Sequence, residues 1–269
     1  MQFGGCSRVT ILTLATLVAI VLLGGTANAQ PYHVIYDFGQ VCPGGWDPIA
    51  VLAAAKNGDL YGVTEGGGAC NGSTIYKLTA PRTRGGAWTQ AVLYEYTANT
   101  EFPVSLVIGE DGALYGTGEG PNTRGFIFRL APPARGKGSW KYDVLYTMNS
   151  NSDGSAPQGN LVFDANGNIY GATELGGGPN GGTVFELKRP TKKGGKWRFS
   201  VLYTFTGKPD GAQPFAGVVF DQTGNLYGTT VNGGASLAGV VCKAGSLIAV
   251  GRRCPFGIAI SVASYFRPS

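Results

Sequence analysis

The sequence contains a single histidine, His33, and this scarcity argues against the active sites that depend on histidine. A Ser-His-Asp triad needs a histidine base, and catalytic zinc is usually held by two or three histidines. His33 opens the run His33 to Phe38, whose β-branched and aromatic residues are typical of a strand. We therefore expect His33 to be a strand residue and not a general base. The sequence names no catalytic residue and weighs against an enzyme.

Charge is also scarce, since charged residues make up 14% of the chain and the formal net charge is only +5. Proteins that bind nucleic acid usually concentrate positive charge in one patch, so we expect no nucleic-acid partner. Glycine runs such as Gly66-Gly67-Gly68 are not followed by Lys-Ser or Lys-Thr, which excludes a phosphate-binding loop of the P-loop kind. No cofactor is expected, apart from a Ca²⁺ ion considered below.

Long apolar runs are missing everywhere except at the N-terminus. Arg8 precedes the apolar run Val9 to Leu23, and Ala27-Asn28-Ala29 has the small-x-small form of a cleavage site. Residues 1–29 are therefore predicted to be a signal peptide, with an uncleaved membrane anchor as the alternative. The mature chain is expected to have no transmembrane segment and to be secreted, either extracellular or periplasmic.

Glycine and aromatic residues are abundant, and they follow a repeat. The dipeptide Tyr-Gly recurs at Tyr61, Tyr115, Tyr170 and Tyr227, with a period of about 55 residues. Short strand-like runs surround each copy, and 45 glycines and 15 prolines fit a turn-rich β protein. The pattern predicts an all-β, propeller-like fold of about four blade units, each with four antiparallel strands, the last unit incomplete.

The third unit shows the expected order most clearly. Its strands are predicted at residues 160–164, 168–173, 183–188 and 200–205, and the turn Ala165-Asn166-Gly167 joins the first two. The other units repeat this order. The run His33 to Phe38 is an early copy of a fourth strand, which in a closed propeller often completes the last blade.

The fourth unit loses the pattern after Thr230. Gly239 to Lys243 is a poor copy of a third strand, and no fourth strand follows. We therefore divide the mature chain into a repeat domain at residues 30–236 and a non-repeat tail at residues 237–269. The tail is either a family-specific terminus or the product of an altered or truncated reading frame.

The repeats, of the form GNLYGTT…GG…GTVFxL followed by VLYxF and DGxxP, resemble the GloVer-type tandem repeats of secreted bacterial proteins. The resemblance covers about Tyr32 to Ala235. It implies an exported repeat domain with a propeller-like fold, without a defined activity or catalytic residues.

Charges separate between the two ends of the predicted blades. In an antiparallel four-stranded unit, the loop after the second strand and the loop after the fourth strand share one end. Those loops carry carboxylates, which we call the acidic rim: Glu65, Glu119 and Glu174 after second strands, and Asp47, Glu101, Asp153 and Asp210 after fourth strands. The opposite end, the basic rim, carries Arg82, Arg84, Arg135, Lys137, Arg189, Lys192, Lys193 and Lys196.

The acidic rim is the expected binding site. Rings of carboxylates bind Ca²⁺ or hydrogen-bond to sugar hydroxyls. The competing interpretation is that Asp153-Gly154 and Asp210-Gly211 only form turns. The basic rim and the neighbouring Trp88, Trp140 and Trp197 (one per unit) could contact anionic glycans, but plain solubility and packing account for them as well.

Four cysteines remain after the predicted signal peptide: Cys42, Cys70, Cys242 and Cys254. Their spacing matches no zinc motif, so no metal ligands are expected among them. Cys42 and Cys70 fall in loops at the acidic rim of the first unit, and in an exported protein they are the expected disulfide pair. A bridge there would stabilise the fold by roughly 3 kcal/mol.

The sequence therefore predicts an exported, non-catalytic propeller that binds an extracellular glycan or protein at its acidic rim. The alternative is a secreted hydrolase or lyase of carbohydrates that uses rim carboxylates.

Overall fold

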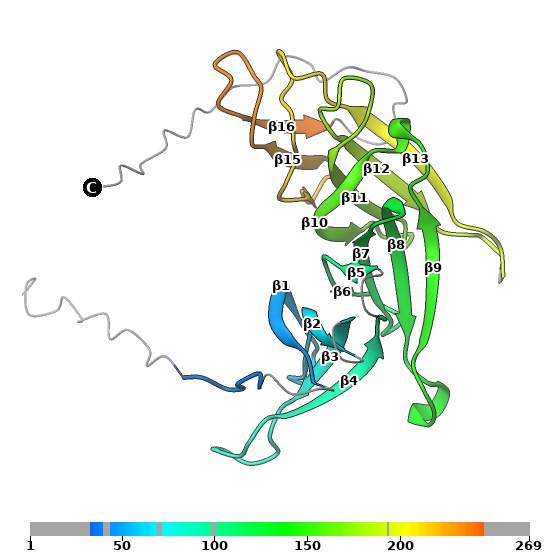
Figure 1. The fold of residues 1–269 in the computed structure, drawn as a ribbon. Coiled ribbons are helices and arrows are strands. Elements are labelled where there is room, and N and C mark those ends of the chain that lie inside the picture. Colours follow the sequence, from blue (N-terminus) through cyan, green and yellow to red (C-terminus); the bar gives the residue numbers. More distant parts are fainter. Residues whose placement is uncertain (1–32, 40–43, 69–71, 98–100, 193, 245–269) are drawn as a thin grey trace, which may run out of the picture. The chain divides into compact units, whose positions relative to one another are not determined.

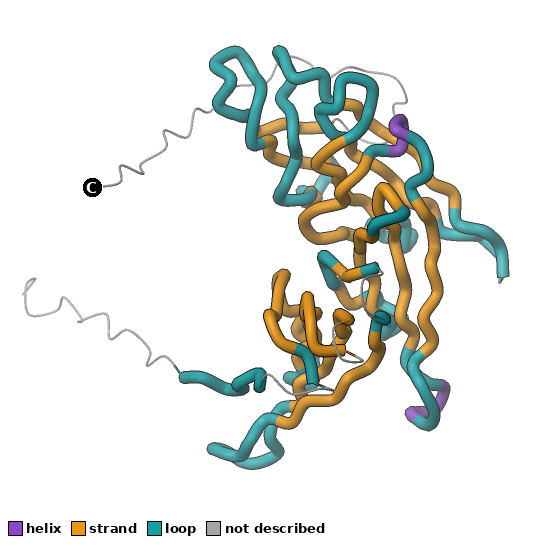
Figure 2. The backbone as a smooth tube through the Cα atoms, in the orientation of Figure 1, coloured by secondary structure: helices purple, strands orange, loops and turns teal. Residues whose placement is uncertain are grey.

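The computed structural model describes residues 33–39, 44–68, 72–97, 101–192 and 194–244. The chain divides into two compact units, residues 1–35 and residues 36–269, and every strand belongs to the second. Within the described residues, strands and two 3₁₀ turns are the only regular elements (Figure 2). The fold is all-β and propeller-like, as the sequence predicted.

Four sheets follow one another along the chain, and we call them blades one to four (Figure 1). Blade one contains β1 (Trp46–Ala54), β2 (Leu60–Gly68), β3 (Gly72–Thr79) and β4 (Thr89–Glu95). Blade two contains β5 (Phe102–Pro103), β6 (Val107–Ile108), β7 (Leu114–Gly120), β8 (Thr123–Ala131) and β9 (Lys141–Thr147). The pieces β5 and β6 both pair with β7, so together they act as the first strand of this blade.

Blade three contains β10 (Ser155–Phe163), β11 (Ile169–Leu175), β12 (Thr183–Lys188) and β13 (Arg198–Thr204). Blade four contains β14 (Val218–Phe220), β15 (Leu226–Thr230) and β16 (Val240–Ala244). The 3₁₀ turns are η1 (Ala134–Gly136) and η2 (Asn151–Asp153). All strand neighbours are antiparallel, and apart from β5, which pairs with β7, they are adjacent in sequence. This is the order that the repeats predicted.

The first strands of blades one and three begin earlier than the sequence suggested. In β10 the register shifts between Gln158 and Val162, and Ala156 has a positive φ of 52°. A β-bulge of this kind continues a strand through residues such as Pro157 that normally mark a loop. The bulge explains why the sequence pattern predicted a strand only from Asn160 onward.

The prediction that His33 to Phe38 forms a strand is wrong, because none of these residues has strand structure. A strand needs a neighbour to accept its backbone hydrogen bonds, and residues 33–39 pair with no strand in the described part of the chain. The side chains of Tyr36 and Phe38 nevertheless pack on blade one. Phe38 makes an edge-on contact with the ring of Tyr76, at 5.0 Å between ring centres.

Two aromatic contacts recur between successive blades. The tyrosine of the repeated phrase meets the tryptophan of the next blade: Tyr61 lies 6.2 Å from Trp140, and Tyr115 lies 6.3 Å from Trp197. A tyrosine of the fourth strand also stacks on a fourth-strand aromatic of the next blade, with Tyr94 on Tyr142 and Tyr146 on Phe199, each at 4.2 Å. Trp140 and Trp197 therefore serve packing between blades.

The glycine of the repeated phrase makes room for an aromatic ring in its own sheet. A Cβ added to Gly171 would lie 2.6 Å from the ring of Phe185, which is fully buried. Gly116 faces Phe128 in the same way. In blade four the register places Cys242 opposite Gly228, so the ring is replaced by a small thiol. β16 also lies beyond residue 236, so the fourth sheet continues past the boundary that the sequence suggested.

Candidate functional site

The two sets of loops expected to form the acidic rim lie at the same end of each sheet. In blade one, the backbone N–H groups of Gly44 and Gly45 donate to the carbonyl oxygen of Gly67. In blade three, the N–H of Gly177 donates to the carbonyl oxygen of Asn151 at 2.6 Å. These bonds join the loop before the first strand to the loop after the second strand.

Two rim aspartates, Asp153 and Asp210, accept several hydrogen bonds from their own loops. The carboxylate of Asp153 accepts hydrogen bonds from the hydroxyl of Tyr146 and from the N–H groups of Asn149 and Ser150. The carboxylate of Asp210 accepts from the hydroxyl of Tyr203 at 2.6 Å and from Thr206.

Burial opposes ionisation of both aspartates, but these hydrogen bonds outweigh it and lower the pKa of each carboxyl. The glycine that follows each aspartate also has no room for a side chain, since a Cβ on Gly154 or Gly211 would collide with a threonine hydroxyl. Both Asp-Gly pairs therefore serve as turn anchors.

In blade one, Asp47 and Glu65 lie on adjacent strands, between the paired residues Trp46–Gly66 and Pro48–Thr64. Both side chains are exposed. Asp47 has a positive φ of 52°, as Ala156 does at the matching position of β10. The positive φ thus recurs at this position in two blades, but only blade one has a carboxylate there.

The most developed part of the rim spans blades two and three. Glu119 in β7 and Glu174 in β11 hold equivalent positions, and both are half-buried. The side-chain amide of Gln158, from β10, donates to Glu119 at 3.0 Å. Burial, together with the charge of Glu174, raises the pKa of the Glu119 carboxyl. Gln158 was not foreseen, because the sequence placed it in a loop and only the bulge carries it into the site.

These three residues offer carboxylate and amide oxygens together with one amide donor. Such groups hydrogen-bond to the hydroxyls of a polar ligand. The described residues contain no group of three His, Cys, Asp or Glu side chains that could hold a metal ion. The expected Ca²⁺ remains a prediction.

At the opposite end of the blades, carboxylates anchor the turn between the first two strands. The hydroxyl of the repeated tyrosine donates to an aspartate in three blades: Tyr115 to Asp111, Tyr170 to Asp164, and Tyr227 to Asp221. Asp111 stands two places later in its turn than the other two aspartates, since it precedes its tyrosine by four residues and they precede theirs by six. The same carboxylate also pairs with Arg129 at 2.7 Å.

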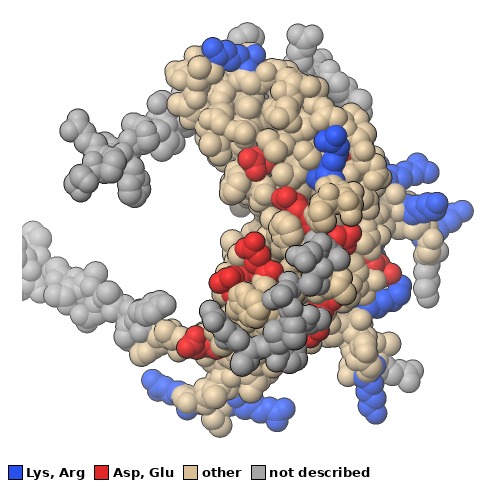
Figure 3. All heavy atoms as spheres, in the orientation of Figure 1, with Lys and Arg blue, Asp and Glu red and all other residues tan. Residues whose placement is uncertain are grey.

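The cations of the basic rim lie in exposed loops. Arg82, Arg84, Lys137, Arg189, Lys192 and Lys196 are all exposed. Figure 3 shows the acidic side chains gathered nearer the middle of this face and the basic ones at outlying loops. The described cations of the basic rim follow third strands, at the opposite ends of the sheets from Glu119 and Glu174.

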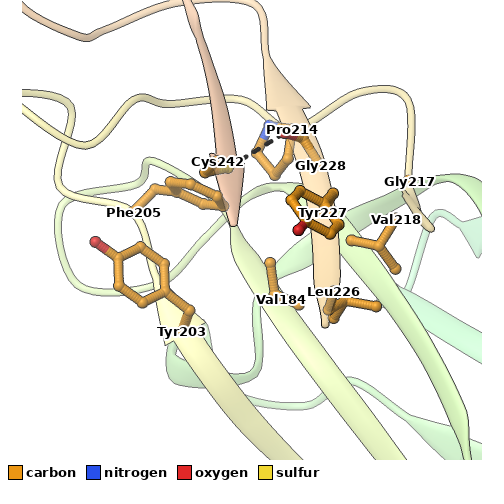
Figure 4. Close-up of a pocket in the computed structure, with 10 residues that line it drawn as sticks. All are labelled: Val184, Tyr203, Phe205, Pro214, Gly217, Val218, Leu226, Tyr227, Gly228 and Cys242. Carbon is orange, nitrogen blue, oxygen red and sulfur yellow. Dashed lines mark hydrogen bonds between the residues drawn. The ribbon is translucent and has the colours of Figure 1, made fainter. Parts of the chain in front are cut away.

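An apolar pocket lies between blades three and four, away from the glutamates. It is lined by Tyr203, Phe205, Tyr227 and Cys242, among others, and its cavity volume is about 20 Å³ (Figure 4). The thiol of Cys242 donates to the carbonyl oxygen of Gly228 at 3.4 Å. A cavity of this size is a packing gap and not a ligand site.

The expected disulfide between Cys42 and Cys70 lies outside the described residues, as does Cys254, and it remains a prediction. No helix in the described ranges is long and apolar enough to span a membrane.

Comparison with known proteins supports the repeat architecture. A family model described as the Gloeobacter/Verrucomicrobia repeat matches residues 82–246, more than half of the chain, which confirms the resemblance noted in the sequence. No curated protein matches the chain.

Among solved structures, the chain is similar to a gluconolactonase from Xanthomonas campestris, with 17% identity, a TM-score of 0.44, and coverage of 71% of this chain and 56% of that one. It is also similar to a protein of unknown function from Dyadobacter fermentans, with 16% identity, a TM-score of 0.47, and coverage of 74% and 65%. The chain spans less than two thirds of the length of either protein. Similarity at this level assigns neither an activity nor a substrate.

Proposed function

The chain belongs to the Gloeobacter/Verrucomicrobia repeat family, and from that premise we propose that it is an exported, non-catalytic propeller that binds an extracellular ligand at the acidic rim. The ligand class proposed first is a carbohydrate, and a protein surface is the second. The observation that carries the proposal is the cluster formed by Glu119, Gln158 and Glu174 across blades two and three.

The chemistry of this cluster suits a ligand rich in hydroxyl groups. Each sugar hydroxyl both donates and accepts a hydrogen bond, so a carboxylate beside an amide can satisfy it in both directions. Half-buried groups also gain more from such bonds than fully exposed ones, because water competes less well for them. We assign Asp153 and Asp210 to the shape of the rim, since the loops already use Oδ2 of Asp153 and both carboxylate oxygens of Asp210.

An enzymatic alternative rests on one observation, the raised pKa of Glu119 beside a second carboxylate. Glycoside hydrolysis uses one carboxyl group that stays protonated as the acid and a second that stays ionised. Under this alternative, Glu119 acts as the acid and Glu174 as the base or nucleophile.

A glycan-array screen of the chain from Gln30 onward, with and without Ca²⁺, tests the proposal. We expect binding to one group of glycans, and we expect the double variant Glu119→Gln/Glu174→Gln to reduce it at least tenfold. Glu110→Gln is the matched control, because Glu110 is an exposed carboxylate beside a turn at the opposite end of blade two. Equal binding by the double variant and the wild type would remove the acidic rim from the proposal.

Turnover separates the two functions. The glycans retained on the array would be incubated with the protein and examined by mass spectrometry for cleavage. Intact glycans support a binding module. Cleavage that Glu119→Gln abolishes, with binding retained, would establish the hydrolase or lyase instead.

Export is part of the proposal and has its own measurement. Expression of the full-length gene in a bacterial host, followed by N-terminal sequencing of protein outside the cytoplasm, should find Gln30 as the first residue. A chain that keeps residues 1–29 would favour the membrane-anchor alternative.

A further inference from the structure

The segment that leads into β14 of blade four lies alongside β10 of blade three, and the two run in the same direction. Asn160 and Gly217 form a parallel bridge between them. The backbones are close just before this bridge, since a Cβ added to Gly159 would collide with the backbone nitrogen of Gly217. Two residues before the bridge on each segment stand Gln158 and Phe215. Parallel pairing therefore makes Phe215 a neighbour of Gln158.

The Pro-Phe pair of blade four occupies the position that a Pro-Gln pair holds in blade three. Pro157 packs on blade two, where a Cβ added to Gly125 would collide with the proline ring. Pro214 packs on blade three at the matching glycine, Gly182, in the same way. Phe215 therefore stands against blade three as its counterpart stands against blade two.

This equivalence brings Phe215 to the glutamates of the acidic rim. Across the junction of blades two and three, Gln158 donates to Glu119 at 3.0 Å. Across the next junction the matching residues are Phe215 and Glu174. The Cβ added to Gly182 that would meet the proline of blade four would also lie 2.7 Å from the carbonyl oxygen of Glu174. We call Glu119, Gln158 and Glu174 the rim cluster, and a phenyl ring continues it into blade four.

Phe215 differs from the other aromatic residues in its exposure. Among the aromatic side chains of the described residues, it alone is exposed, with 53% of its surface open to solvent. A single exposed apolar residue needs no explanation by itself. This ring, however, stands at the end of a row of hydrogen-bonding groups. Val231, which occupies the glutamate position in blade four, is also 57% exposed. Blade four thus presents apolar surface where blades two and three present carboxylates.

An exposed aromatic ring beside carboxylate and amide groups matches the two kinds of surface on a sugar. A sugar ring carries hydroxyl groups around its edge and C–H groups on its faces. The face of an aromatic ring is electron-rich and attracts such C–H groups, while carboxylate oxygens accept hydrogen bonds from the hydroxyls. Ligand sites commonly combine aromatic surface with a few convergent polar groups.

We propose that Phe215 is the platform on which one sugar ring of a neutral glycan stacks, while the rim cluster binds hydroxyl groups of the same glycan. The inference rests on the proposed function and adds the ligand class and a specificity-determining residue to it. The glycan is neutral because a sugar carboxylate would lie beside the like charges of Glu119 and Glu174. The aromatic face then selects sugars that present a C–H face to the rim.

The experiment uses the chain from Gln30 onward on an array of neutral and uronate-containing glycans. Titration calorimetry then follows the neutral glycan that binds most strongly. We expect Phe215→Ala to weaken its binding by about tenfold or more, whereas Phe215→Tyr keeps the ring and should bind like the wild type. Phe215→Leu is apolar without an aromatic face and should bind much more weakly than Phe215→Tyr. Val219→Ala is the matched control, because Val219 is an apolar residue of the same blade with 61% exposure.

Saturation-transfer NMR supplies a readout that a merely structural role would not change. Irradiation of the aromatic protein resonances should transfer saturation to the ring C–H protons of the bound glycan. At equal occupancy, we expect this transfer to fall sharply in Phe215→Ala and to persist in Phe215→Tyr and Val219→Ala.

The possible failures are distinguishable. Binding that the double variant Glu119→Gln/Glu174→Gln abolishes and Phe215→Ala leaves unchanged would remove the platform and keep the proposed function. Binding by Phe215→Leu equal to that of the wild type would also remove stacking, since an apolar contact alone would suffice. Preferential binding of uronate-containing glycans would overturn the neutral ligand class. An array on which the wild type binds no glycan would overturn this inference together with the carbohydrate ligand of the proposed function.

Discussion

Blades three and four begin with nearly the same sequence and end very differently. Both open with an aspartate turn followed by Asn-(Ile/Leu)-Tyr-Gly, and in both the tyrosine hydroxyl reaches the turn aspartate. Blade three then places Phe185 opposite its glycine and adds β13, whereas blade four places Cys242 there and has β16 as its last described strand. The turn and the phrase therefore suffice to start a blade, and the aromatic ring and the fourth strand finish its packing.

The largest expected effect comes from making blade three resemble blade four. Phe185→Cys removes a fully buried ring and leaves a cavity, so we expect a loss of about 3–5 kcal/mol in the free energy of unfolding. Urea denaturation followed by circular dichroism measures it. The exposed Lys188→Ala in the same strand is the control and should change stability by less than about 0.5 kcal/mol. A loss below about 1 kcal/mol for Phe185→Cys would mean that the ring is not what distinguishes the blades.

The reverse change should stabilise blade four. Cys242→Phe places a ring beside Tyr203 and Phe205, at the apolar pocket, and we expect a gain of about 1 kcal/mol. Thermal unfolding should rise by a few degrees for this variant and not for Cys242→Ser. A lower melting temperature for Cys242→Phe than for Cys242→Ser would show that the pocket cannot accept a ring.

A third comparison concerns the loop anchors that both blades share. Tyr203→Phe removes the hydroxyl that donates to Asp210, and Tyr146→Phe removes the one that donates to Asp153. We expect each variant to lose about 1 kcal/mol.

The Tyr203→Phe loss should depend on pH. The pKa of Asp210 is lowered in the folded state, so its contribution is present above the unfolded pKa and disappears as pH falls through the folded one. Denaturation at about pH 7 and about pH 2 measures the difference, and an equal loss at both values would contradict it.

The smallest expected effect is at Glu119, where blade four has Val231 at the equivalent position and no carboxylate. Burial and the charge of Glu174 raise the pKa of Glu119 in the folded protein. Its stabilising contribution is therefore complete below the unfolded pKa of about 4.3 and is lost as pH rises through the folded pKa. Glu119→Gln should flatten the stability profile in that window. A profile identical to the wild type would mean that the pKa of Glu119 is not raised in the folded protein.

Much of the architecture was predictable from the sequence, because each repeat carries its own turn and strand signals. The predicted strand at residues 183–188 coincides with β12, and the tyrosine period correctly gave four sheets. The extra length of β1 and β10 was not predictable, because each strand continues through a bulge. In β1 the positive φ inside the bulge falls on Ala50, a residue type that rarely adopts this conformation. Because the bulge was not foreseen, Gln158 was predicted to lie in a loop, and its place beside Glu119 and Glu174 was missed.

The strand expected at His33 to Phe38 is absent for a physical reason. Tyr36 and Phe38 pack against blade one through Gln90 and Tyr76. Strand structure also needs backbone partners, and a sequence pattern cannot supply those. Among the rim carboxylates, sequence spacing brought the loops together correctly, but only the structure separates Asp153 and Asp210, which anchor turns, from Glu119 and Glu174.

The shifting position of the turn aspartate has a consequence for how these repeats can change over time. In three blades the tyrosine hydroxyl donates to an aspartate of the preceding turn. The aspartate stands first in the turn in blades three and four, and third in blade two. These three blades therefore share where the charge arrives in space and not its place in the sequence. A search for diverged blades in related genomes should accordingly score the Tyr-Gly pair strictly and accept an acid anywhere in the preceding turn.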